Sequence, residues 1–266
     1  MADESLPQVA RIAAGEFLMG ADEGEPDERP IHRTYVDDFA IGLCPVTNAD
    51  YAEFVRDTGH PSPAIRALPL IVSGALESDF RSTASGYFWN NGTPPRGREH
   101  HPVTLVGFDD AVAYCAWLGA KISKPVRLPT EAEWERAARG GLESKRFPWG
   151  DALDAASAHF LADAAAKSDR GTAPVGSYPA NAFDLHDMAG NVWEWVSDWY
   201  APDYYTRGQY INPLGPDTGV MRIVRGGAWV NADARYLRCA YRHKVPPDSY
   251  AYSIGFRIAY SLGNNG

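Results

Sequence analysis

The residues best suited to chemistry lie between positions 225 and 242, in the stretch RGGAWVNADARYLRCAYR. It combines one cysteine with four arginines, two glycines and a tryptophan. A thiolate is a nucleophile and a ligand for soft metal ions, whereas a buried thiol behaves as a small apolar residue. Cys239 is therefore either an active-site thiol or a packing residue. The other cysteines, Cys44 and Cys115, lie far away in the sequence without CxxC spacing, which argues against a disulfide scaffold or a cysteine zinc site.

A second group of candidate ligands lies at residues 183–200, FDLHDMAGNVWEWVSDWY. Asp187, Asn191, Glu194 and Asp198 supply hard oxygen donors over a short span, and Gly190 permits a turn that exposes main-chain carbonyls. Calcium prefers such a mixture of carboxylates and carbonyl oxygens. The alternative is a polar turn that caps a helix, with tryptophans packed beneath it. The residues alone leave both interpretations open.

Composition and charge exclude several classes of function. The 266 residues are 45% hydrophobic and 22% charged, as in ordinary globular proteins. The net charge is −9 with no basic block, which argues against nucleic-acid binding. No signal peptide and no run of about 18 apolar residues is visible, so we expect a cytoplasmic protein that does not contact membranes. Nucleotide-binding loops and the HExxH and GxSxG motifs are also missing.

The pattern of apolar residues predicts three helices. PVTNADYAEFVRDTG has Thr47 as its N-cap and Gly59 at its end, LPTEAEWERAARGG has the capping pair Thr130 and Glu133, and DDAVAYCAWLGAK begins at Asp109 or Asp110. Short strands are predicted in EFLMG, YVDDFAIG, RIVRGG and IGFRIAY, and a long surface excursion at 66–98. No βαβ alternation is present. We therefore expect a single irregular α+β domain with little regular secondary structure.

Taken in order, the segments EFLMG, PVT, RLPTEAEWERAARGG, FPWGD, GTAPVGSYPAN, DMAGNVWEW, RGGAW and IGFR resemble the formylglycine-generating enzyme, or sulfatase-modifying factor, family. The resemblance covers residues 8–260 and leaves 1–7 and 261–266 as terminal tails. It implies the formylglycine-generating-enzyme variant of the C-type lectin fold.

The best-known members of this family oxidise a sulfatase cysteine to formylglycine with O2, using two cysteines that bind copper(I). Thiolates are natural ligands for that ion. In this sequence Asn231 occupies the position of the first cysteine, no second cysteine follows, and Cys239 matches a small residue in a later RCAYR stretch. The resemblance therefore implies that the copper pair is absent and that formylglycine generation is lost. Cys239 becomes a packing residue, which we place at a half-buried strand position.

The resemblance also implies one structural calcium site. The family's ligands, which are one acidic or amide side chain, two main-chain carbonyls and one glutamate, map onto Asp187, Gly190, Val192 and Glu194. A second calcium site of the family would require His159 and Lys167 as ligands, and a lysine is electrostatically unsuitable there. We expect that second site to be lost. Whether a transition metal is bound stays open.

The family binds its peptide in a groove beside the cysteine pair, so we expect a peptide or a small polar ligand in the corresponding region. Arginine and tyrosine suit planar polar groups, although the arginines are equally suited to a structural role. The predicted groove residues are Trp229, Asn231, Tyr236, Arg238, Arg242, His243, Tyr250 and Tyr252.

Three functions are consistent with this sequence. The first is a sulfatase-modifying-factor-like protein that has lost the copper chemistry and binds a ligand in the groove. The second is a metal-dependent, O2-using oxidoreductase with iron or copper, as in the related ergothioneine and pyoverdine pathway members. The third is a ligand-binding protein of the retroelement-diversified type, which shares the fold. Whether the protein is an enzyme is therefore undecided at this level.

Overall fold

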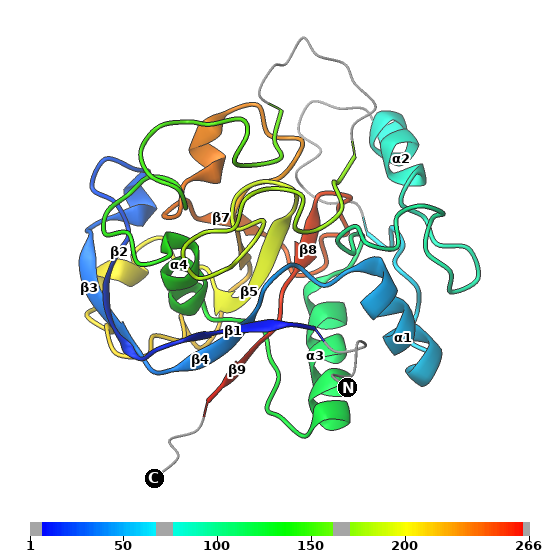
Figure 1. Cartoon of the computed structure of the whole chain (residues 1–266), viewed down its shortest axis with the longest axis horizontal. Coiled ribbons are helices and arrows are strands. Elements are labelled where there is room, and N and C mark those ends of the chain that lie inside the picture. Colours follow the sequence, from blue (N-terminus) through cyan, green and yellow to red (C-terminus); the bar gives the residue numbers. More distant parts are fainter. Residues whose placement is uncertain (1–6, 68–76, 162–170, 263–266) are drawn as a thin grey trace.

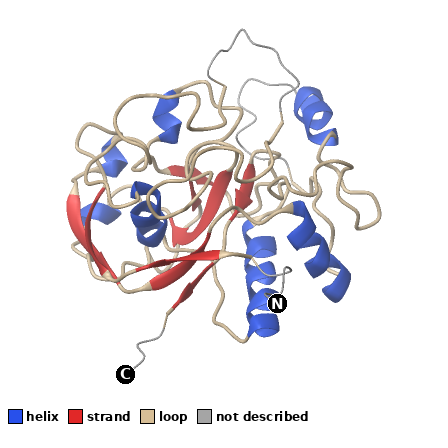
Figure 2. Ribbon diagram, in the orientation of Figure 1, coloured by secondary structure: helices blue, strands red, loops and turns tan. Residues whose placement is uncertain are grey.

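Loops carry most of the chain in the computed structural model, which describes residues 7–67, 77–161 and 171–262. Four α-helices and nine short strands occur in these residues, and tan loop segments dominate Figure 2. The expected single α+β domain with little regular secondary structure is confirmed. No helix in the described ranges is long and apolar enough to cross a membrane.

The three predicted helices are present. α1 (Asn48–Thr58) is capped by Thr47 and ends at Gly59, which adopts a left-handed φ of 70°. α4 (Glu131–Arg139) begins with the predicted Thr130 capping box. α3 (Phe108–Ile122) begins slightly earlier than predicted, because the Asp110 carboxylate accepts a hydrogen bond from the Gly107 N–H at 3.0 Å.

A fourth helix, α2 (Glu77–Ser85), lies inside the segment that was predicted to be a surface excursion. Only Phe80 and Ala84 of this helix are buried, so its apolar face is too narrow to be recognised in the sequence. In Figure 1 it lies at the periphery, apart from the other helices.

Three sheets organise the strands. β1 (Val9–Ile12), β4 (Phe39–Gly42) and β9 (Ala259–Ser261) form an antiparallel sheet, and β2 (Gly15–Met19) pairs with β3 (His32–Val36). The central sheet has the order β7 (His243–Val245), β6 (Arg222–Arg225), β5 (Trp193–Trp199) and β8 (Ile254–Phe256). The β5–β8 pair is parallel and the others are antiparallel. Two of the predicted strand stretches, YVDDFAIG and IGFRIAY, therefore each divide between two sheets.

The central sheet separates two hydrophobic clusters. α1 and α3 lie together on one side of this sheet in Figure 1, and the β2–β3 pair lies on the opposite side. The first cluster joins α1 and α3 to β5 and β8 and contains Cys115, whereas the second joins α4 to the outer strands and contains Cys239.

The stretch 183–200 folds as a turn that leads into strand β5, so the alternative of a turn that caps a helix is wrong. β5 is buried along most of its length. Near-continuous burial suits a central strand covered on both faces.

Candidate functional site

Arg238 and Arg242, two of the predicted groove residues, are largely buried, although Arg238 also lines a pocket beside residues 20–24. Arg242 is 2% exposed, and its Nε and Nη2 donate to the two oxygens of Glu131 at 2.8 and 2.9 Å. Arg238 donates to both oxygens of Glu28 at 2.6 and 2.7 Å. Both guanidinium groups are thus held in buried bidentate ion pairs, which corrects their predicted place in a groove.

Arg225 extends this buried network along α4. Its Nη2 donates to Glu135 at 2.6 Å and its Nη1 to Glu131 at 3.1 Å, while both groups also donate to main-chain carbonyls at Cys239 and Ala240. Burial opposes ionisation of Glu135, but Arg139 and Arg225 hold the pKa of its carboxyl below the usual range. These pairs fix the segment after β6 against α4.

Cys239 lies inside this network and is 1% exposed. Burial raises the pKa of its thiol to about 12. The prediction that it packs in the core agrees with this placement, but the predicted strand position is wrong. Cys239 lies in a turn after the short 3-10 helix Ala234–Leu237, where its N–H donates to the Arg146 carbonyl at 2.8 Å.

Four aromatic side chains form one half of the surface where the groove was predicted. The ring of His243 stacks on Trp193 with centroids 4.8 Å apart, and Tyr236 and Tyr241 pack edge to face at 5.0 Å. Tyr236 also contacts Trp193, at 6.0 Å. Burial and the nearby Lys244 lower the pKa of His243 to about 4, so its imidazole is neutral at pH 7.

The other half of this surface surrounds Tyr252. Its ring lies 5.9 Å from Trp229, 5.1 Å from Phe80 of α2 and 5.8 Å from Tyr87. Trp229 is 8% exposed, and its buried Nε1–H has no partner among the described residues. Val230 packs against the aromatic clusters on both sides. We call the combined face the aromatic surface, formed by Trp193, Tyr236, Tyr241, His243, Trp229, Val230 and Tyr252.

The remaining two predicted groove residues, Asn231 and Tyr250, lie in different places from each other. Asn231 borders the aromatic surface, where its side-chain oxygen accepts the Ala228 N–H at 2.7 Å and its carbonyl accepts the Leu161 N–H at 3.0 Å. Tyr250 lies beneath the guanidinium of Arg66, near the start of α3, and contacts neither aromatic group in the described ring pairs. The fold thus brings together Trp229, Asn231, Tyr236, His243 and Tyr252.

Sequence reasoning missed three members of this surface, the aromatic residues Trp193 and Tyr241 and the aliphatic Val230. Trp193 belongs to the WEW segment, whose tryptophans were interpreted only as packing beneath a polar turn. Tyr241 sits between two arginines whose interior pairs were not foreseen. The signal available for Trp193 and Tyr241 was the local density of aromatic residues.

The predicted calcium ligands lie together where the turn enters β5. Asp187 is 5% exposed, and its Oδ2 accepts the Gly176 N–H at 2.8 Å. Its backbone and that of Gly190 have left-handed φ values of 56° and 82°. The Gly190 and Val192 carbonyls are buried, and neither accepts a hydrogen bond from any residue in the described ranges. Buried carbonyls of this kind normally have a partner.

Glu194 completes this group, although other side chains already contact its carboxylate. It is 0% exposed and accepts hydrogen bonds from Arg257 at 2.6 and 2.7 Å and from the Trp134 Nε1–H at 2.8 Å. Asp187, Glu194 and Arg257 together carry one net negative charge. Burial, with a contribution from Glu194, raises the pKa of Asp187 above its usual range. A buried carboxylate without a full counter-charge and two unpartnered carbonyls fit a calcium ion.

The described part of the chain contains no group of three or more His, Cys, Asp or Glu side chains that could hold a metal ion. The predicted calcium ligands Asp187, Gly190, Val192 and Glu194, here called the calcium group, are consistent with this, because two of the four donors are main-chain carbonyls. At the second family position, both ring nitrogens of His159 contact other groups, the Gly171 carbonyl and the Tyr178 hydroxyl. Lys167, on which that prediction also rests, lies outside the described residues.

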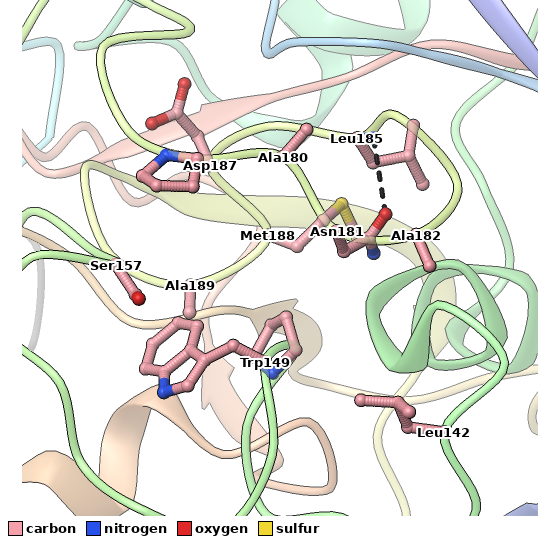
Figure 3. A pocket seen from close by; sticks show the side chains of 12 residues that line it. Leu142, Trp149, Ser157, Ala180, Asn181, Ala182, Leu185, Asp187, Met188 and Ala189 are labelled. Atoms are coloured by element: carbon pink, nitrogen blue, oxygen red, sulfur yellow. Dashed lines mark hydrogen bonds between the residues drawn. The ribbon is translucent and has the colours of Figure 1, made fainter.

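A pocket of about 240 Å³ borders the calcium group, and the sequence did not predict it. Its wall is largely apolar and includes Leu142, Trp149 and Met188, while the Asp187 carboxylate lies at the end away from Leu142 (Figure 3). The polar atoms of Asn181 are occupied by main-chain partners, which include Leu185 as drawn. The pocket thus offers shape and apolar contact more than hydrogen bonds.

The chain belongs to the family described by the sulfatase-modifying factor enzyme 1-like domain, whose model matches residues 1–262. It is 38% identical over 282 residues to the formylglycine-generating enzyme of Streptomyces coelicolor, covering 94% of this chain and 88% of that protein. The family that the motifs suggested is therefore confirmed.

Two solved structures share the fold. PvdO from Pseudomonas aeruginosa superposes with a TM-score of 0.79 and 28% identity, covering 97% of this chain and 96% of the other. The Treponema denticola variable protein 1 superposes with a TM-score of 0.72 at 23% identity, covering 95% and 94%, and shows likeness of fold alone. The predicted variant of the C-type lectin fold is thus confirmed.

Proposed function

We propose that this protein binds a peptide or a small polar ligand on the aromatic surface and does not generate formylglycine. The observation that carries the proposal is the position of Cys239. It is the one cysteine in the C-terminal part of the chain, and it is enclosed by the Arg225–Glu135 network. A thiol buried there, with its pKa raised to about 12, is a poor copper(I) ligand and has no second thiol beside it in the sequence.

The aromatic surface supports the binding half of the proposal. Tyr236 and Tyr252 are only partly buried, so their rings are accessible for stacking. Tyrosine and tryptophan supply large contact areas at low conformational-entropy cost, and they also offer hydroxyl and indole donors. The Trp229 Nε1–H is a buried donor without a partner among the described residues, so the indole lies beneath the aromatic surface and supports Tyr252 from below.

Selection from a library of random heptapeptides on the immobilised protein tests this binding. Enriched peptides should bind the wild type in calorimetry and lose at least about tenfold in affinity on Tyr236→Ala or Tyr252→Ala, as for contact residues that each contribute about 1.4 kcal/mol. Tyr260→Ala is the matched control, because Tyr260 is equally half-buried but lies in β9, outside the aromatic surface. Failure to enrich any peptide would contradict a peptide as the ligand, and equal losses in all three variants would contradict the aromatic surface as the binding site.

We further propose that calcium binds to Asp187, the Gly190 and Val192 carbonyls and Glu194. The ion would supply the positive charge that Asp187, Glu194 and Arg257 together lack, and would satisfy the two carbonyls that have no partner among the described residues. Isothermal titration with CaCl2 tests this binding. Asp187→Asn should abolish the heat of binding, whereas Asp184→Asn, which alters an exposed residue with a similar φ of 60°, should leave it unchanged.

An oxidoreductase that uses O2 and a transition metal is the second candidate, and the structural similarity to PvdO favours it. The neutral imidazole of His243, stacked on Trp193, supplies a nitrogen donor within the aromatic surface. Stoichiometric iron or copper after anaerobic purification, removed by His243→Phe, would support this candidate. Calcium as the sole stoichiometric metal would favour the binding protein.

A further inference from the structure

The segment 187–194, here called the calcium loop, is bonded directly to the segment that carries the aromatic surface. The Gly190 N–H donates to the Gly226 carbonyl at 2.9 Å, and the Trp229 N–H donates to the Asn191 carbonyl at 3.0 Å. Asn191 lies between the two residues whose carbonyls face no described donor. The positions of the ion and of Trp229 are therefore separated by a single residue and one hydrogen bond.

Asn191 makes several hydrogen bonds at this junction. It is buried, has a left-handed φ of 61°, and its side chain both accepts from the Ala173 N–H at 3.0 Å and donates to the Ala173 carbonyl at 3.2 Å. Its own N–H donates to the His159 carbonyl at 2.8 Å. A non-glycine residue in this conformation persists where its surroundings specify it.

Trp229 carries the connection onward to the ligand-binding face. Its N–H is bonded to the calcium loop, while its ring contacts Tyr252 and its Nε1–H is left without a described partner. A shift of the Asn191 carbonyl would therefore move the indole and the ring that it supports.

We propose that calcium in the loop 187–194 controls the ligand affinity of the aromatic surface through the Asn191–Trp229 hydrogen bond. This inference rests on the proposed ligand binding and on the proposed calcium site. Without the ion, the buried carboxylates of Asp187 and Glu194 share one buried counter-charge, Arg257, and the carbonyls on either side of Asn191 have no partner among the described residues. With the ion, the loop is fixed, the Trp229 N–H keeps its acceptor, and the surface is preorganised for its ligand. By linkage, the ligand raises the affinity for calcium by the same factor.

Amide hydrogen exchange of the full chain, measured by NMR without any ligand, tests the connection. In EGTA, the amides of Gly190 and Trp229 should exchange at least about tenfold faster than in CaCl2, in line with typical coupling between sites. The Arg127 amide, which donates to the Ala259 carbonyl at 2.8 Å in another sheet, should not change. In the Asp187→Asn variant, these two amides should exchange fast in both buffers, at the rate of the wild type in EGTA. In the Asp184→Asn variant, they should exchange as in the wild type in each buffer. Should Asp187→Asn fail to fold, the comparison of wild type in the two buffers is sufficient.

Faster exchange at Gly190 with an unchanged Trp229 would overturn the coupling, and no change at either amide would overturn both the coupling and the calcium site. Equal acceleration at Arg127 would indicate global destabilisation and would also overturn the proposal. A peptide selected on the aromatic surface should bind about tenfold more weakly in EGTA. If no peptide is obtained while the amides respond as expected, the proposed ligand class fails and the connection stands.

Discussion

Arg242 and Glu131 are joined by two hydrogen bonds of 2.8 and 2.9 Å, although 111 residues separate them in the sequence. Both side chains are buried, and the Nη1 of Arg242 also donates to the Asp27 carbonyl. This pair connects the residue before β7 to the start of α4 and explains why an arginine that appeared suited to a ligand faces inward instead. Arg238 repeats this bidentate arrangement with Glu28, whereas Arg225 divides its two nitrogens between Glu131 and Glu135.

Removing Arg242 should destabilise the fold strongly. Arg242→Ala leaves Glu131 buried with one fewer partner, and loss of one member of a buried pair costs about 3–5 kcal/mol in the free energy of unfolding. Arg235→Ala removes an exposed arginine from the same segment and should change stability little. Urea unfolding of both variants checks this. Similar midpoints for the two would show that Arg242 is not a structural residue.

The three thiols should react slowly with Ellman's reagent in the native protein. The pKa values of Cys115 and Cys239 are raised to about 12 by burial, and that of Cys44 to about 11, so the thiolate fraction at pH 8 is very small. Cys44 is only half-buried and should react first. All three should react at once in guanidinium chloride. Fast labelling of Cys239 in the native state would contradict its role in packing.

The stabilising contribution of Asp198 to the fold should decrease as the pH rises from about 4 to 7. Burial, with a contribution from Glu131, raises the pKa of its carboxyl to about 7, so the folded state binds more protons than the unfolded state in this range. The contribution of Asp198 to the free energy of unfolding falls by at most about 1.4 kcal/mol per pH unit in this range and is constant above pH 7.

Asp198→Asn keeps a side-chain oxygen that can accept from the Glu131 N–H and does not ionise. The difference in unfolding free energy between this variant and the wild type should therefore grow in favour of the variant between pH 4 and 7. Chemical unfolding across this range measures it. A difference independent of pH would show that Asp198 titrates as an ordinary carboxyl.

His243 should remain neutral throughout the physiological range. Its folded pKa of about 4 lies below the ordinary value of 6.5, so it favours folding above pH 6.5, and that contribution is lost as the pH falls towards 4. The imidazole resonances of His243 should be constant from pH 8 to about 5.5 in an NMR titration. A midpoint near 6.5 would mean that the ring is solvated and not stacked on Trp193.

Local signals in the sequence predicted the helices well. Thr47 and Thr130 cap α1 and α4 as expected, because a capping box depends on residues only three positions apart. α2 was missed because its buried face consists of only two residues. The strands divided unexpectedly because strand pairing is determined by distant partners, such as β4 with both β1 and β9.

The candidate sites were predictable to different degrees. The residues of the calcium group lie within eight positions of one another, so their proximity follows from the local chain. The arginines could not be assigned from the sequence, because their partners Glu28 and Glu131 are 210 and 111 residues away. The resemblance to the family identified where the groove should be, but it did not indicate that Tyr250 would lie beside Arg66.

The most direct test of the proposed loss of copper chemistry is a measurement of aldehyde formation. The protein, reconstituted anaerobically with copper(I), is incubated in air with a cysteine-containing sulfatase peptide, and the peptide is analysed by mass spectrometry. The formylglycine-generating enzyme of Streptomyces coelicolor serves as the positive control. We predict that the peptide keeps its cysteine unchanged with this protein. Catalytic conversion to formylglycine would contradict the assignment of Cys239 as a packing residue and the proposal of a binding protein.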